Sequence, residues 1–215
     1  MAIQTQGTTG NIMEVDTTFK AARMTLRPAE VLGWHSIGAQ SGLVTGVAAN
    51  GALFSLRNIA ANPIMVRRIG IGFTITTGFT AAQTLDWGLN IARAFTASDT
   101  GGTAVALTGS NTKHRTSLAT PTSLDCRIAT TAALTAGTKT LDTNTMSQIN
   151  AYAIAAGAGA AMPASLSNLF GHDAGDYPLI LAQNEGLNIL NLTAMGAAGV
   201  GKFYVNMELA EVTSY

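Results

Sequence analysis

The stretch IGIGFTIT, residues 69–76, predicts the fold of this chain. Large apolar side chains occur at every second position, which is the period of a β-strand with one buried face. The apolar positions are Ile69, Ile71, Phe73 and Ile75. The intervening positions are glycine or threonine, so the second face of this strand has little bulk, and another backbone or sheet can approach it closely.

The same alternation recurs along the chain. Leu85, Trp87 and Leu89 fall on one face of a second strand, which favours core packing for Trp87 over a sugar-stacking role. Further strands are predicted at residues 22–27, 43–49, 53–57, 126–130, 138–141, 146–154, 178–183, 187–193 and 202–213. Ser165–Phe170 is predicted as a single helical turn. This series of short strands without long helices predicts an all-β fold, a β-sandwich of the jelly-roll type.

Two tight turns predict β-hairpins. Asn50-Gly51 is a strong two-residue turn signal between the strands at 43–49 and 53–57. Asn184-Glu185-Gly186 separates the strands at 178–183 and 187–193 in the same way. We therefore expect each pair of strands to be neighbours in one sheet.

The chain is expected to have one domain and an N-terminal arm. Residues 1–18 are polar and rich in glycine and threonine, with a short apolar patch at Ile12, Met13 and Val15. We interpret them as a flexible arm that becomes ordered against a neighbouring subunit or a shell. Residues 19–215 contain no Pro-rich run, charge block or break in composition, which indicates a single β-sandwich domain.

The low charge of the chain points to assembly. Only 11% of the residues are Asp, Glu, Lys or Arg, against about 25% in an ordinary globular domain. Twelve basic and twelve acidic side chains cancel to a net charge of zero, and proteins near zero net charge tend to associate. A neutral chain is also a poor match for nucleic acid, which requires a basic surface.

No segment predicts membrane insertion or secretion. No run of 18 strongly apolar residues is present, and the first residues lack a basic region followed by an apolar stretch. The single cysteine, Cys126, excludes an internal disulfide framework and is expected to be a small buried residue.

The sequence offers few groups for catalysis, and we expect no enzyme activity, no cofactor and no metal. The nearest approach to a cation site is His172, Asp173 and Asp176, but it lacks the alternating acidic ligands of a calcium loop and is interpreted as a polar surface loop. Lys113, His114 and Arg115 form a basic group in a polar loop, a candidate for exposed recognition together with that surface loop. Arg67 and Arg68 are expected on opposite faces of a strand, so that they form no basic patch.

Four blocks of sequence carry a resemblance to a known class of protein. They are FKAARMTLRP at 19–28, TAGTKTLD at 135–142, YPLILAQNEGLNI at 177–189 and VNMELAEVTSY at 205–215. Together they resemble uncharacterised virion structural proteins encoded by tailed bacteriophages. The resemblance implies a β-sandwich subunit located in the virion and assembled in the host cytoplasm.

Two functions follow from these observations as hypotheses. The first is a capsid decoration (cement) protein that forms a homo-oligomer, expected to be a trimer, and stabilises the shell by contact with other virion proteins such as the major capsid protein. The alternative is a receptor- or glycan-binding module of a phage head fibre or tail, with its recognition loops at 96–117 and 172–176.

Overall fold

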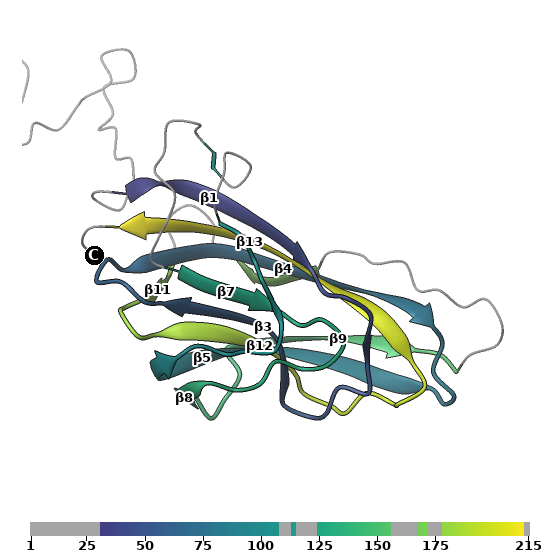
Figure 1. Ribbon diagram of the computed structural model, residues 1–215. Helices are drawn as coiled ribbons and strands as arrows, with labels where there is room; N and C mark the ends of the chain where they lie inside the picture. The colour runs from purple at the N-terminus through teal and green to yellow at the C-terminus, as the bar shows by residue number, and fades with distance from the viewer. Residues whose placement is uncertain (1–30, 108–112, 115–123, 156–166, 172–177, 213–215) are drawn as a thin grey trace, which may run out of the picture.

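The computed structural model describes residues 31–107, 113–114, 124–155, 167–171 and 178–212, and these form two antiparallel sheets packed face to face with no helix (Figure 1). The first sheet contains β1 (Val31–Gln40), β13 (Val200–Val212), β4 (Ile64–Thr77) and β10 (Ser167–Gly171) in that order. In the same sheet, β2 (Val44–Thr45) pairs with β13, and β11 (Leu179–Leu181) pairs with β4. The second contains β6 (Thr103–Ala104), β7 (Leu124–Ile128), β3 (Gly51–Asn58), β12 (Gly186–Asn191), β5 (Gln83–Ala97) and β8 (Thr138–Leu141), with β9 (Ser147–Ala153) also on β5. The predicted all-β sandwich is confirmed.

The strand order is that of a jelly roll. Eight strands form its frame, namely β1, β3, β4, β5, β9, β10, β12 and β13 in chain order. In one sheet β1, β13, β4 and β10 lie side by side, which are the first, eighth, third and sixth of these strands. In the other sheet the order is β3, β12, β5 and β9, which are the second, seventh, fourth and fifth. The chain therefore crosses between the two sheets at almost every connection, as expected of the two Greek keys of a jelly roll.

The core lies between the sheets and is built by the predicted alternation. The apolar positions of β4, Ile69, Ile71, Phe73 and Ile75, are all buried. Trp87 of β5 is 4% exposed, and its ring centroid lies 5.4 Å from that of Phe73 and 6.3 Å from that of Phe203 on β13. Trp87 is thus a core residue, as predicted, and Cys126 is buried in the same core.

Both predicted hairpins are wrong, although the chain turns at both places. Asn50 and Asn184 have positive φ angles of 61° and 58°, a conformation that asparagine tolerates better than most residues. The first turn lies between β2, which pairs with β13, and β3, which belongs to the opposite sheet. The second turn likewise separates β11, on β4, from β12 in the other sheet. These tight turns are crossings between sheets.

A third difference concerns the segment predicted as a helical turn at Ser165–Phe170. Residues 167–171 instead form β10, an edge strand that pairs with β4 through Asn168↔Gly70 and Gly171↔Arg68. The pairing with β4 determines the conformation of this short segment. The predicted arm at 1–18 and the predicted strand at 22–27 lie outside the described residues.

Candidate functional site

The outer face of the first sheet carries a groove whose floor is made of glycine. Gly38 of β1, Asn206 of β13 and Gly70 of β4 are aligned in register across the three strands. The next row consists of Gln40, Tyr204 and Gly72, and the row on the other side consists of Ser36, Glu208 and Arg68. Because three positions near the middle of this face have no side chain, the backbone of β1 and β4 is open to an approaching molecule.

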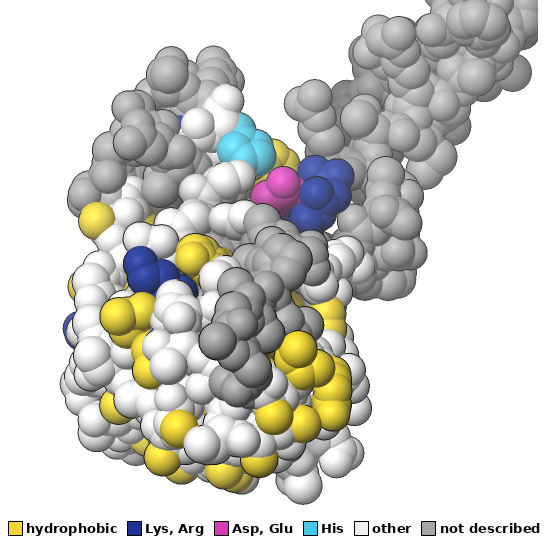
Figure 2. All heavy atoms as spheres, turned by 90° about the vertical axis from the view of Figure 1, so that its right-hand side faces the viewer, with side chains coloured by type: hydrophobic (Ala, Val, Ile, Leu, Met, Phe, Trp, Pro, Cys, Tyr) yellow, Lys and Arg dark blue, Asp and Glu magenta, His cyan; other side chains and the backbone are white. Residues whose placement is uncertain are grey.

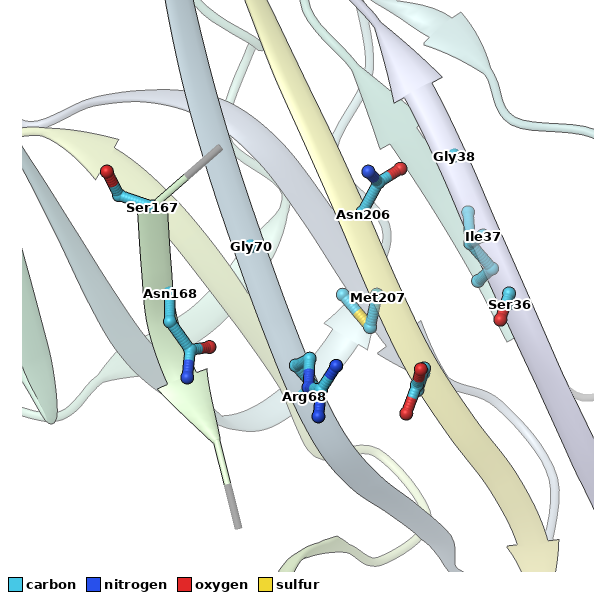
Figure 3. Close-up of a pocket in the computed structure, with 10 residues that line it drawn as sticks. Ser36, Ile37, Gly38, Arg68, Gly70, Ser167, Asn168, Asn206 and Met207 are labelled. Atoms are coloured by element: carbon cyan, nitrogen blue, oxygen red, sulfur yellow. The ribbon is translucent and has the colours of Figure 1, made fainter. Parts of the chain in front are cut away.

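Two adjoining depressions form this sheet groove. One has a volume of about 510 Å³ and the other about 470 Å³, and both are lined by Gly38 and Asn206. Figure 3 shows Asn206 on β13, between Gly38 on β1 and Gly70 on β4, with Ser167 and Asn168 on β10 at the far side. The sheet groove therefore extends across the whole width of the first sheet.

One end of the sheet groove is charged by Arg68 and Glu208, and a β-bulge in β4 adds a second arginine there. Glu208 pairs with Arg68 but the next residue, Leu209, pairs with Val66, so Arg67 is the extra residue. The guanidinium of Arg67 lies 3.9 Å from the Glu208 carboxylate and 5.7 Å from the centre of the Trp34 ring, while Arg68 lines the groove. The expectation that the two arginines point to opposite faces is wrong, since the bulge breaks the alternation and brings both to the outer face.

The other end of the sheet groove is polar and uncharged. It is lined by Gln40, Thr74 and Tyr204, with Gly72 on the floor. Hydroxyl and amide groups of this kind both donate and accept hydrogen bonds, so they do not require the bound molecule to carry a charge.

Two of the predicted recognition residues lie beside this face. Lys113 forms an isolated β-bridge with His35, and the backbone N–H of His114 donates to the Trp34 carbonyl at 3.0 Å. The His114 Nε2 lies 2.5 Å from the Ser36 Oγ, at the charged end of the sheet groove. Lys113 and His114 thus run along the free edge of β1. The predicted residues Ile12, Met13, Val15, Arg115, His172, Asp173 and Asp176 lie outside the described residues.

His35 lies on the inner side of this edge and is electrostatically unusual. Its side chain is buried, and its Nδ1 has no hydrogen-bond partner among the described residues. Burial lowers the pKa of His35, and the nearby positive charges of Lys113 and His114 lower it further, while the Glu211 carboxylate opposes the shift. The neutral imidazole is therefore favoured in the folded chain.

The sheet groove offers hydrogen-bonding side chains and strand backbone to an approaching molecule. The contact between Ser36 and His114 joins a hydroxyl to an imidazole, but no carboxylate among the described residues hydrogen-bonds the other ring nitrogen of His114, which a catalytic triad would need. The described part of the chain also contains no cluster of three or more His, Cys, Asp or Glu side chains that could hold a metal ion. Nor does it contain a helix long and apolar enough to cross a bilayer.

Sequence reasoning found only one strand of this site. The Gly70 and Gly72 positions indicated a strand face with little bulk, and that signal was correct. The partners of these glycines, Gly38 and Asn206, come from strands that are distant in sequence, and only the register of the sheet aligns them.

Comparison of the chain with protein-family models, with curated proteins and with solved structures gave no match.

Proposed function

We propose that this chain is a structural subunit of a tailed-phage virion, a capsid decoration protein that forms a trimer and stabilises the shell through contacts with the major capsid protein. The observation that carries the self-association is the glycine floor of the sheet groove at Gly38 and Gly70. A second copy of the chain can bring a backbone or a small side chain against this floor at close distance.

The surface chemistry supports association between copies. The described part of the face in Figure 2 shows few charged side chains, and most of that part is polar or apolar. With net charge zero and 11% charged residues, little repulsion opposes the approach of a second copy.

The architecture is compatible with the virion assignment without deciding it. Jelly rolls occur in viral capsid proteins and also in lectins, and a fold by itself does not define a function. The phage assignment comes from the four sequence blocks described above, and the assembly assignment comes from charge and the sheet groove.

The variant Gly70→Phe tests self-association through this face. Among the described residues, a Cβ atom at Gly70 would meet only the carbonyl oxygens of Ser167 at 3.8 Å and Asn206 at 4.0 Å, which are ordinary contact distances. We therefore expect the variant to fold, with its new side chain occupying the groove. Light scattering over a concentration series should give a trimer mass for the unchanged chain and a monomer mass for the variant. Binding of each protein to bare capsids then tests the decoration role.

The matched control is Gln148→Phe, which adds the same side chain at an exposed position on β9 in the other sheet. This control should keep the trimer mass and the capsid binding. A monomer at every concentration for the unchanged chain, or a trimer that persists in Gly70→Phe, would rule out the sheet groove as the contact between copies.

One observation favours glycan binding as a second function. The sheet groove combines Arg68, Asn168 and Glu208 with the ring and hydroxyl of Tyr204, a set of hydrogen-bonding groups and an aromatic surface suited to a sugar. Titration with host-surface oligosaccharides should then show saturable binding that Tyr204→Ala weakens. No binding by the unchanged chain at millimolar sugar would exclude this function.

A further inference from the structure

A lysine, an aspartate and an asparagine meet in a buried site on the second sheet, away from the sheet groove. Asn188 lies on β12 between Leu187 and Ile189, which face the core, so its side chain is on the outer face of that sheet. Asp99 follows β5, and Lys139 lies in β8, which pairs with β5. Three segments far apart in the sequence thus converge on this Lys–Asp–Asn site.

The Asp99 carboxylate joins the other two side chains. Its Oδ1 accepts hydrogen bonds from the Lys139 Nζ and from the Gly137 backbone N–H, the latter at 2.7 Å. Its Oδ2 accepts a hydrogen bond from the Asn188 Nδ2, also at 2.7 Å. The Asn188 Oδ1 is buried without any partner in the described structure. An amine and a carboxamide are therefore held on opposite oxygens of one carboxylate.

Water is largely excluded from the site. The Lys139 side chain is 5% exposed and that of Asp99 is fully buried. The Lys139 Nζ lies 4.7 Å from the centre of the Phe95 ring, which is itself buried. Keeping an ion pair in such surroundings is costly, and a lysine amine becomes a nucleophile when desolvation and a nearby base remove its proton.

We propose that the Lys139 Nζ and the Asn188 Cγ become joined by an intramolecular amide bond, with Asp99 transferring the protons. The product would tie β8 covalently to β12 and make the second sheet resistant to unfolding. This inference does not depend on the proposed virion role.

The reaction balances within the three side chains. The Lys139 ammonium gives a proton to the Asp99 carboxylate, and the neutral amine attacks the Asn188 Cγ to form a tetrahedral intermediate. Asp99 returns its proton to the departing Nδ2, the C–N bond of the carboxamide breaks, and ammonia leaves. The Lys139 nitrogen also loses a second proton, which the released ammonia takes up to become ammonium. The reaction therefore needs no oxidant or other reactant.

The bond should form slowly after folding. Burial acts to raise the pKa of Asp99, but the hydrogen bonds from Gly137, Lys139 and Asn188 outweigh it and hold this pKa below its ordinary value. The neutral amine and protonated carboxyl are therefore a minor species in the folded chain. Proximity offsets this, because the Lys139 and Asn188 side chains are both hydrogen-bonded to the Asp99 carboxylate.

Mass spectrometry of the purified full-length chain tests the proposal. After prolonged incubation of the folded protein and then denaturation, the intact mass should be about 17 Da below that of the sequence, the mass of one ammonia. Trypsin should fail to cut after Lys139, so residues 128–202 should appear as one peptide with the same deficit. This second readout separates the amide bond from loss of ammonia elsewhere in the chain.

Two variants provide the controls. Lys139→Arg keeps the positive charge but has no amine that can form the bond, and Asp99→Asn removes the proton carrier with little change of shape. Both should show the full mass and normal cleavage after position 139. A full mass for the unchanged protein would overturn the proposal, and a deficit of about 18 Da would place the bond on Asp99 with loss of water, which would overturn the assignment to Asn188.

Discussion

His35 is a buried base with positive neighbours, and its pKa is lowered in the folded chain. When the pH falls below about 6.5, the ordinary pKa of histidine, the unfolded chain takes up a proton at this residue while the folded chain does not. The unfolded state then binds more protons, so the free energy of unfolding decreases as the pH falls through this range. Above that pH both states are neutral at His35, and we expect no dependence. Urea denaturation at a series of pH values between 7.5 and 5.5 measures the effect.

The variant His35→Gln should lose part of this pH dependence, because glutamine does not titrate. The matched variant His114→Gln changes an exposed imidazole and should keep most of the dependence. Equal loss of stability on acidification in the unchanged chain and in His35→Gln would show that other groups determine the response.

At the scale of the elements, the contact of β4, β5 and β13 through Phe73, Trp87 and Phe203 is expected to dominate stability. Phe203 is fully buried between the sheets, and its ring lies 6.3 Å from that of Trp87. Phe203→Ala removes these contacts and leaves a cavity, which should lower the free energy of unfolding by about 3–5 kcal/mol. Chemical denaturation followed by tryptophan fluorescence measures the change.

Tyr152→Ala is the comparison, since Tyr152 lies on the edge strand β9 and is 59% exposed. Its removal should change the free energy of unfolding by no more than about 0.5 kcal/mol. Comparable losses for the two variants would mean that the interior between the sheets is not tightly packed around Phe203.

The elements themselves could be predicted from the sequence, but their pairing could not. Strand β4 was evident because its side chains alternate, and alternation is a local property of each strand. The turns at Asn50 and Asn184 were also evident, yet each was interpreted as a hairpin. A tight turn depends on two or three residues, whereas the sheet that each flanking strand joins depends on β13, β12 and β4, which lie far away in sequence. The bulge at Arg67 was missed for the same reason, since it exists only relative to the register with β13.

At the scale of the whole molecule, both candidate sites arise from long-range register. The sheet groove needs Gly38 and Gly70 on either side of Asn206, and the Lys–Asp–Asn site needs Lys139 and Asn188 on one carboxylate. The spacing of these residues in the sequence predicts neither arrangement. Composition could predict only the general property, a surface with little charge.

That property leads to a prediction about the trimer, which depends on the proposed function. Screening by salt weakens contacts between charges and has little effect on close packing of backbone and uncharged side chains. The centre of the sheet groove is uncharged, and its charged residues, Arg68 and Glu208, lie at one end. The mass measured by light scattering should therefore be the same at about 50 mM and about 500 mM salt, where the screening length falls from more than 10 Å to less than 5 Å. Dissociation at high salt that Arg68→Gln reproduces at low salt would locate the contact at the charged end instead, with Arg68 bound to a carboxylate of the second copy.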